Sequence, residues 1–355
     1  MLSSVALFSL IAPIAAQTWT SCNPLNQTDC PTDTALSMSH EFNFTQTSAG
    51  STWNTTAGTI LYNDDGAEFT INNRGDAPTM QSKFYIFFGE VEVWLKAATG
   101  QGVVSSIVLE SDDLDEVDWE FTGTNTTHGE TNYYGKGNTT AAATRAFWHP
   151  VESPQTLFHN YTTRWTADRI EWFIDGTSVR TLEYADANGG ASFPQTPMNV
   201  RLGIWAAGDK DNNNYTIAWA GGETDYTKGP YTMYVQSARV TDFSSGKEYK
   251  YGDQTGTWKS IDVIQGNSTV AETLSRPPPK TLAQRWAGLS TGAKIAIYTA
   301  IGAVVLALIG VSTICCITQR KAGRRERALA DANWEKDHAE VMAYRARYRS
   351  QRDEF

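Results

Sequence analysis

An uncharged run of 23 residues, from Ile295 to Ile317, restricts the fold of this chain more than any other feature of its sequence. About 20 apolar residues are enough for a helix to cross the hydrocarbon core of a bilayer. Basic residues stay on the cytoplasmic side of such a span, and five follow it closely: Arg320, Lys321, Arg324, Arg325 and Arg327. The sequence therefore predicts a type I plasma-membrane protein, with residues 295–317 as the transmembrane helix and residues 318–355 as a basic cytoplasmic tail.

The first 16 residues predict an export signal. After Met1, an apolar stretch ends in small residues at Ala16, as a signal peptide does, although no charged side chain precedes it. We expect cleavage near Ala16; a buried N-terminal strand or helix is the alternative. Because 38 residues follow Ile317, the span does not fit the removable hydrophobic tail of a glycolipid anchor.

Eight Asn-x-Ser/Thr sequons lie before the predicted span and none lies after it. Only lumenal sequons are glycosylated, so this distribution agrees with an exported N-terminal body. Chance accounts for some of them in a chain rich in Thr and Asn. The candidate glycosylation sites are Asn26, Asn43, Asn54, Asn125, Asn138, Asn160, Asn214 and Asn267.

The four cysteines fall into two pairs. Cys22 and Cys30 lie close together in the exported part, where disulfides form, and we expect a bond between them. Cys315 and Cys316 lie at the inner edge of the span, where we expect apolar filling or S-acylation rather than a disulfide. These thiols do not make a metal cluster, and neither a metal nor a cofactor is predicted.

The exported body has the composition of an aromatic-rich β protein. Aromatic residues make up 12% and charged residues 19% of the chain, which argues against a coiled coil and a wholly disordered chain. From Trp19 to Tyr251, short β-branched and aromatic runs are broken by Gly, Asn and Asp, which is typical of a sandwich or barrel. Asp175-Gly176, between two such runs, suits a two-residue hairpin turn. The formal net charge is −10 and the acidic excess lies in the body, so nucleic-acid binding is not expected.

The chain therefore divides into one all-β domain, residues 17–265, and a membrane-anchoring part. Residues 266–294 are expected to form a stalk that contains a stiff, extended spacer at residues 276–280, where three consecutive prolines follow Arg276. For the tail we weigh two structures, a membrane-proximal helix attracted to anionic lipid and a solvated, irregular segment.

Residues 115–121, Asp-Glu-Val-Asp-Trp-Glu-Phe, carry the clearest chemical signal in the body. Successive side chains of a strand alternate between its faces, so Glu116, Asp118 and Glu120 share one face. The opposite face is apolar and can be held in a core. Carboxylates in a row repel one another and add nothing to packing. An acidic stripe exposed to water, or a calcium site, would explain them without catalysis.

Cleavage of a glycosidic bond is a reaction that uses acids of this kind. It needs one carboxylate as nucleophile and one protonated carboxylic acid, and retention of configuration needs the two about 5–5.5 Å apart. The Cα atoms of residues i and i+4 on a flat strand are about 13 Å apart. For Glu116 and Glu120 to act on one sugar, the strand therefore has to be curved, with the acids on its concave side.

The acidic segment and its surroundings resemble glycoside hydrolase family 16, in particular its fungal branch, the Crh cell-wall transglycosylases. The likeness extends from about Trp19 to Ile261, and several separated motifs agree. Besides Asp-Glu-Val-Asp-Trp-Glu, the matching segments are residues 22–25, 131–137, 193–198, 201–206 and 219–222.

This resemblance implies a β-jelly roll, a concanavalin A-like sandwich, with a concave substrate groove and a retaining mechanism. Glu116 would be the nucleophile, Asp118 the residue that assists it, and Glu120 the acid/base. Since Asp118 lies between the other two, its charge or a shared proton can keep Glu120 protonated while Glu116 is ionised. The three would titrate as a coupled unit.

Sugar-contacting residues are also implied by the resemblance. A Trp face stacks on a pyranose ring, and Arg donates to hydroxyls or to an N-acetyl carbonyl. The six candidates are Arg201, Trp205, Thr216, Asn132, Tyr133 and Lys136. For Trp205, a place in the core is the alternative, and three further tryptophans are expected to lie in the core: Trp94, Trp165 and Trp172.

The activity implied is that of a transglycosylase which cleaves chitin and transfers the chain to β-glucan acceptors in the cell wall, close to the plasma membrane. A retaining hydrolase of β-linked glucan or chitin is the alternative, since both form the same glycosyl enzyme at Glu116. A non-catalytic carbohydrate-binding wall glycoprotein also remains open, because a fold does not fix a function. A signalling receptor is not expected, since a 38-residue tail is too short for an independent domain.

Overall fold

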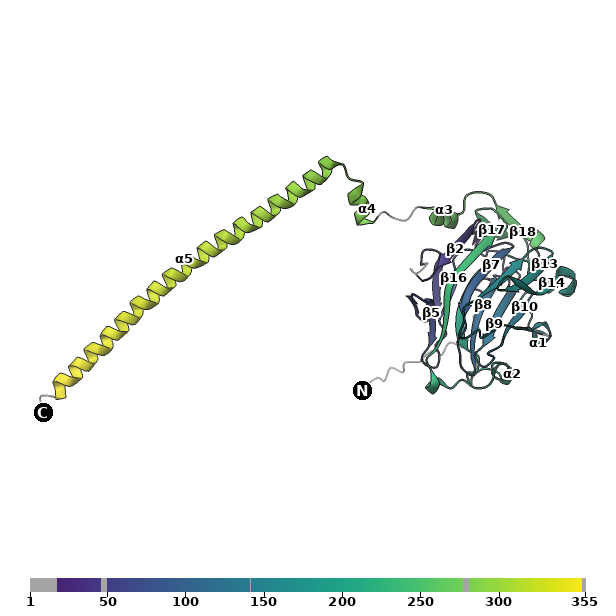
Figure 1. Cartoon of the computed structure of the whole chain (residues 1–355), viewed down its shortest axis with the longest axis horizontal. Helices are drawn as coiled ribbons and strands as arrows, with labels where there is room; N and C mark the ends of the chain where they lie inside the picture. Colours follow the sequence, from purple (N-terminus) through teal and green to yellow (C-terminus); the bar gives the residue numbers. More distant parts are fainter. Residues whose placement is uncertain (1–17, 46–49, 141, 277–280, 353–355) are drawn as a thin grey trace, which may run out of the picture. The chain divides into compact units, whose positions relative to one another are not determined.

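Two antiparallel β-sheets account for most of the N-terminal unit, which ends at Arg276, in a computed structural model of the chain (Figure 1). The structure describes residues 18–45, 50–140, 142–276 and 281–352, and from 347 to 352 it describes the backbone alone. The predicted signal peptide, residues 1–16, therefore lies outside the described residues. So do the prolines of the predicted stalk.

The first sheet has seven strands, in the order β11-β10-β9-β8-β15-β6-β3. It forms where the chain alternates between apolar and polar residues, and β8, β9 and β10 run side by side in it (Figure 1). The acidic segment found in the sequence is β9. The bounds are β3 (Trp53–Ala57), β6 (Thr79–Ser82), β8 (Val103–Ser111), β9 (Glu116–Thr122), β10 (His128–Tyr134), β11 (Phe147–Pro150) and β15 (Met198–Ala206).

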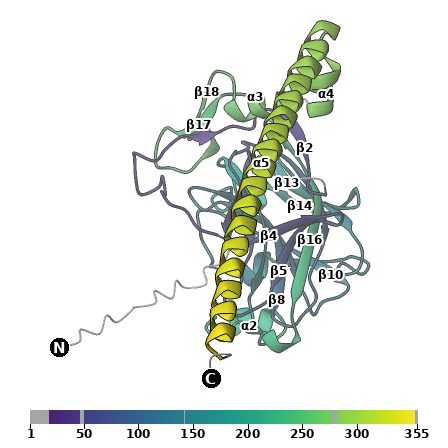
Figure 2. The same ribbon diagram turned by 90° about the vertical axis from the view of Figure 1, so that its left-hand side faces the viewer.

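The second sheet has eight strands: seven in the order β14-β13-β12-β7-β16-β5-β4, and β2, which also pairs with β16. Figure 2 shows β4, β5 and β16 within this sheet. The hairpin predicted at Asp175-Gly176 is confirmed, since both residues have positive φ and join β13 to β14. The bounds are β2 (Ser39–Asn43), β4 (Ile60–Asn63), β5 (Gly66–Ile71), β7 (Gly89–Lys96), β12 (His159–Trp165), β13 (Arg169–Ile174), β14 (Thr177–Glu183) and β16 (Tyr231–Asp242).

The core lies between the two sheets and confirms the predicted jelly-roll sandwich. Trp119 of β9 packs on Tyr161 of β12, with ring centroids 5.3 Å apart. Trp165 and Trp172 are fully buried as expected. The placement of Trp94 in the core is wrong, because its side chain is 42% exposed. The neighbouring residues of β7, at positions 93 and 95, face the core, so strand alternation turns Trp94 outward.

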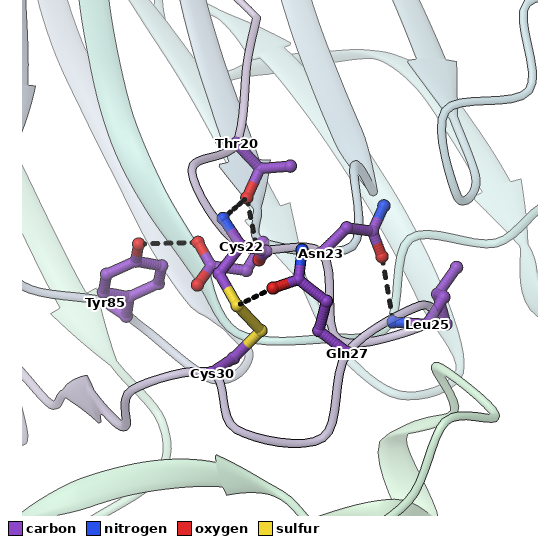
Figure 3. The surroundings of a disulfide bond; sticks show 8 residues. Thr20, Cys22, Asn23, Leu25, Gln27, Cys30 and Tyr85 are labelled. Atoms are coloured by element: carbon purple, nitrogen blue, oxygen red, sulfur yellow. Dashed lines mark hydrogen bonds between the residues drawn. A yellow bond between two sulfur atoms is a disulfide. The ribbon is translucent and has the colours of Figure 1, made fainter.

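A small third sheet of β1 (Asp33–Thr34), β17 (Glu248–Tyr251) and β18 (Ile261–Ile264) follows the N-terminal loop. That loop is closed by the predicted disulfide between Cys22 and Cys30, which the structure confirms (Figure 3). Figure 3 also shows Tyr85 beside the loop, where its hydroxyl donates to Asp112 at 2.9 Å. Cys315 and Cys316 are free thiols.

Helices in the N-terminal unit are short. They are α1 (Ala142–Arg145), α2 (Asn214–Trp219), α3 (Thr269–Ser275) and the 3-10 turns Tyr184–Asp186, Tyr226–Lys228 and Trp258–Ser260. The asparagine before α2, Asn213, caps the helix by accepting from the backbone N–H of Thr216. This cap fixes the start of the helix and with it the direction in which the α2 side chains project.

The C-terminal unit contains α4 (Leu282–Ala287) and α5 (Thr291–Arg352). The described residues of the predicted stalk include α3 and α4, which were not expected, and the expected extended spacer lies mostly outside the described residues. Local capping explains the difference: Ser268 caps α3, and Thr281 forms a capping box with Gln284 at the start of α4. By length and composition α5 can cross a membrane. It continues through the described part of the tail, which is therefore helical rather than irregular.

Candidate active site

β9 carries its three acids on the face turned away from the core. Val117, Trp119 and Phe121 are buried between the sheets, so Glu116, Asp118 and Glu120 project from the other side. Glu116 and Glu120 line a cavity of about 640 Å³, and Asp118 lies between them, 2% exposed. The alternation predicted from the sequence is present, and the acids face a cleft rather than a sealed interior.

The cleft has its floor on neighbouring strands and its walls on two short helices. Ser106 and Val108 of β8 contribute to the floor, together with Glu130, Asn132 and Tyr134 of β10. The segment that contains α1 forms one wall, and α2 with its preceding loop forms the other. The lining residues from the two walls are Thr139, Ala142, Ala143, Ala146, Asn213, Tyr215, Thr216 and Trp219.

Three of the six predicted sugar-binding residues line this cleft together with the catalytic acids. Trp205 lies in it from β15 and Thr216 from α2, and Asn132 pairs with Asp118 across β10 and β9. Trp205 is partly exposed, and its ring is 6.3 Å from that of Trp219. The alternative of a core position for Trp205 therefore does not hold.

The other three predicted residues do not line the cleft. Tyr133 faces the core, because strand alternation places it opposite Val117 rather than Asp118. Lys136 lies in the turn after β10, where its backbone N–H donates to Asp115 at 2.9 Å. Arg201 is 3% exposed and forms an ion pair with Glu110. These positions do not support the prediction that the three residues contact sugar.

Burial raises the pKa values of all three acids, and repulsion by neighbouring carboxylates adds to the rise for Asp118 and Glu120. Burial is the main cause for Glu116, whose pKa rises to about 7, while Asp118 and the charge of Arg201 oppose the rise. The pKa of Asp118 is raised well above its ordinary value by burial and by the charges of Glu116 and Glu120. For Glu120 the pKa is also raised well above its ordinary value, by burial and then by Glu130 and Glu116. Burial therefore favours the protonated form of each of the three acids.

Glu130 and Tyr134 are site residues that the sequence reasoning missed. Glu130 pairs with Glu120 in the register, and its carboxylate accepts from the indole N–H of Trp219 at 2.7 Å. Both residues have the same parity along β10 as Asn132, so they share its face. The two-residue alternation applied to β9 would have found them in β10 as well.

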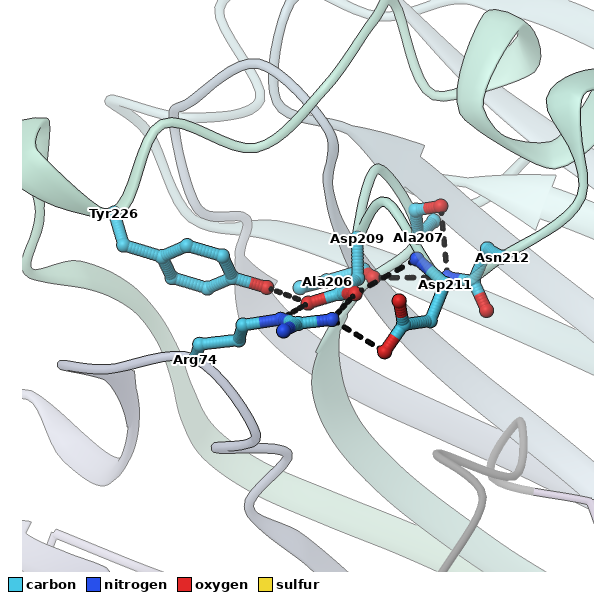
Figure 4. Close-up of polar contacts among 7 residues, drawn as sticks. All are labelled: Arg74, Ala206, Ala207, Asp209, Asp211, Asn212 and Tyr226. Atoms are coloured by element: carbon cyan, nitrogen blue, oxygen red, sulfur yellow. Dashed lines mark hydrogen bonds and ion pairs between the residues drawn. The ribbon is translucent and has the colours of Figure 1, made fainter. Parts of the chain in front are cut away.

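A salt bridge outside the cleft holds the loop that leads to α2 (Figure 4). Arg74 donates from Nε and Nη2 to the two carboxylate oxygens of Asp209, each at 2.7 Å, and Tyr226 donates to the same carboxylate at 2.7 Å. Asp209 is buried, and these bonds, Arg74 foremost, lower its pKa. The bidentate pair therefore fixes the loop on which Thr216 and Trp219 are carried.

Metal ligation has no support in the described residues, among which no group of three or more His, Cys, Asp or Glu side chains is arranged to hold an ion. Two of the acids of β9, Glu116 and Glu120, instead form a carboxyl pair on one strand face, with pKa values raised by burial. A β-sandwich whose cleft contains such a pair defines an enzyme that acts on glycosidic bonds.

Comparison with known proteins gives the particular family. Residues 47–221 match Glycosyl hydrolases family 16. The chain is 57% identical to Crh-like protein 2 of Botryotinia fuckeliana (strain B05.10) over 325 residues, 90% of this chain and 72% of that protein. It is 51% identical to Crh-like protein 3 of Aspergillus fumigatus (strain ATCC MYA-4609 / CBS 101355 / FGSC A1100 / Af293) over 346 residues, 97% of this chain and 94% of that protein.

A solved structure, apo Crh5 transglycosylase, is 53% identical, with a TM-score of 0.66, over 68% of this chain and 100% of that one. The Crh5 transglycosylase in complex with NAG matches equally well, over 68% of this chain and 99% of that one. The chain therefore belongs to glycosyl hydrolase family 16 and, within it, to the Crh-like proteins.

Proposed function

We propose that this protein is a retaining transglycosylase that cleaves chitin and transfers the released chain to β-glucan in the cell wall. The observation that carries the proposal is the pair formed by Glu116 and Glu120, which line one cleft from one face of β9 and whose pKa values are raised by burial. The Crh5 transglycosylase that binds NAG supports N-acetylglucosamine chains as donor.

The reaction takes two steps at one anomeric carbon. Glu116 attacks this carbon as a carboxylate, the glycosidic C–O bond breaks, and Glu120 gives its proton to the departing oxygen. An acceptor hydroxyl then attacks the glycosyl enzyme while Glu120 takes its proton, and Glu116 leaves as a carboxylate. Asp118 lies between Glu116 and Glu120 on the same strand face, and its raised pKa favours a proton on it beside Glu116.

A transfer assay with the full-length protein in detergent tests this function. Chitin oligosaccharides serve as donor and a fluorescent β-glucan oligosaccharide as acceptor, and the Glu116→Gln variant is the matched control. Labelled products longer than the acceptor support the proposal. Shortened chitin without labelled products would identify a hydrolase, and binding without any product would leave a carbohydrate-binding glycoprotein.

The proposal extends to where the enzyme works. Residues 17–265 would form the catalytic domain at the cell wall, α5 would anchor it in the plasma membrane, and the C-terminal tail would lie in the cytoplasm. Support comes from the apolar part of α5 and the basic residues that follow it. In intact spheroplasts, a C-terminal epitope tag should be protected from added protease, whereas the glycosylated N-terminal unit should be digested. Digestion of the tag before permeabilisation would refute this topology.

A further inference from the structure

Arg201 lies on the cleft face of the seven-stranded sheet but is almost completely covered. In the register it pairs with Val108 of β8, and Val108 pairs with Asp118 of β9, so all three face the same side. Its 3% exposure arises partly from Glu110 of β8 and Asn199 of β15, which pair with its guanidinium. A further contact comes from the start of the described chain.

Trp19 closes over Arg201 through both its backbone and its ring. The Nη2 of Arg201 donates to the carbonyl oxygen of Trp19 at 2.9 Å, and Nε donates to the side chain of Asn199 at 3.0 Å. The indole ring lies over the guanidinium, with its centroid 5.6 Å from Cζ. Burial raises the pKa of Glu110, and Arg201 and the backbone N–H of Trp19 oppose that rise. Arg201, paired with Glu110, thus holds Trp19 in place instead of contacting a sugar.

Trp19 remains 48% exposed. One face of its indole ring lies over the guanidinium, so the opposite face points away from Arg201. The preceding residue, Thr18, lines the same cleft as Glu116 and Glu120. The N-terminal segment therefore continues the cleft past the catalytic acids on the β15 side and presents a flat aromatic surface there.

The disulfide loop holds the C-terminal side of this segment. Thr20 accepts from the N–H of Cys22 at 3.3 Å and donates to its carbonyl at 3.0 Å, and Cys22 is bonded to Cys30 (Figure 3). Trp19 is consequently fixed between a covalent loop and a buried ion pair. A platform fixed in this way binds a ligand without a large loss of conformational entropy.

We propose that Trp19 is an additional sugar-binding residue, which stacks on a pyranose ring of a bound N-acetylglucosamine chain beyond the sugars held at the catalytic acids. Glu110 and Arg201 act as positioning residues for it. The chemistry is that of an aromatic face against the apolar C–H face of a sugar. This inference rests on the proposed function for the identity of the sugar and adds a binding position on the N-terminal segment.

Binding by an inactive enzyme tests the inference separately from catalysis. In the full-length Glu116→Gln protein, affinities for chito-oligosaccharides of two to six units are measured by calorimetry. Trp19→Ala should weaken binding of the longest oligosaccharide about tenfold, which is about 1.4 kcal/mol, and should leave the disaccharide unchanged. Trp19→Phe should restore most of the loss, because it keeps a flat aromatic face.

Trp94→Ala is the matched control, since Trp94 is similarly exposed but lies on β7 of the other sheet. Equal affinities for all lengths in Trp19→Ala and its parent would overturn the inference. An equal loss for short and long oligosaccharides would also overturn it, because it would indicate a purely structural role. If chitin is not a ligand of this protein, the parent binds no chito-oligosaccharide of any length, which is a different outcome.

Discussion

Asp118 and Glu116 lie two residues apart on the same face of β9, and burial together with the charge of Glu116 raises the pKa of Asp118 well above its ordinary value. Neither carboxylate oxygen of Asp118 has a hydrogen-bond partner among the described residues. Two ionised carboxylates side by side repel each other, so the raised pKa favours the neutral, protonated form of Asp118. A neutral Asp118 is able to donate a hydrogen bond to Glu116, the proposed nucleophile.

A neutral Asp118 predicts that its two simplest replacements differ in activity. Asp118→Asn retains a neutral side chain that can donate to Glu116, whereas Asp118→Leu cannot donate. A hydrogen bond to a charged group contributes about 1.5–3 kcal/mol, so kcat/KM for transfer should be about ten- to a hundredfold lower in the Leu variant than in the Asn variant. Equal loss in both variants would mean that Asp118 acts through its charge.

The variants Glu116→Gln and Glu120→Gln should block different steps of the reaction. Glu120→Gln removes a general acid and should lower kcat about 10²- to 10⁴-fold. With a donor whose leaving group needs no protonation, this variant should still form a covalent glycosyl enzyme, visible by mass spectrometry. Glu116→Gln should form none, because it lacks the nucleophile. Covalent labelling of Glu116→Gln would assign the nucleophile to another residue. Unchanged circular dichroism spectra would show that the fold is intact.

The pH dependence of kcat/KM should be bell-shaped. Glu116 has to be ionised, so activity should rise as pH approaches about 7, its raised pKa. Glu120 has to be protonated, so activity should fall again above its raised pKa. Arg201 lowers the pKa of Glu116, so Arg201→Met should move the acidic limb to higher pH. An acidic limb that does not move in Arg201→Met would contradict this coupling.

Asp209→Asn should destabilise the exported unit, because it breaks the bidentate bond with Arg74 that holds the α2 loop. We expect a loss of about 1–3 kcal/mol in the free energy of unfolding, measured in urea at neutral pH. Asp211→Asn is the matched control, since Asp211 also contacts Arg74 but is exposed, and its effect should be smaller.

The ion pair of Asp209 and Arg74 also predicts how the free energy of unfolding depends on pH. The folded-state pKa of Asp209 is lowered, so its contribution is fully present above the unfolded-state pKa of about 3.9 and is lost as pH falls through the folded-state value. The difference between the parent and Asp209→Asn should therefore stay constant from pH 8 to 6 and shrink below about pH 4. A difference that persists unchanged at low pH would show that the ionised carboxylate is not the stabilising group.

Local patterns were sufficient to predict the elements that depend on neighbouring residues in the chain. Two-residue alternation placed the acids of β9 on one face, and Asp175-Gly176 predicted the hairpin turn, since both depend on backbone geometry within a few residues. The helices α3 and α4 were missed because the run of prolines was given more weight than the capping residues Ser268 and Thr281.

Side-chain roles that depend on distant segments could not be predicted in this way. Arg201 was expected to contact sugar, and its position on the strand agrees with that expectation. Its burial arises partly because Trp19, far away in the sequence, closes over it. The error at Tyr133 has a different cause. The two-residue alternation that places Asn132 in the cleft also places Tyr133 in the core, so the sequence was sufficient to predict its position.

The sequence by itself was sufficient to predict a helix able to cross a membrane, the disulfide and the acidic face of β9, because each follows from composition or from periodicity along the chain. Tertiary structure alone decided how far the acids of β9 are buried and which residues contact Arg201. These properties depend on burial and on charges brought together by strands that are separate in the sequence, so no local pattern records them.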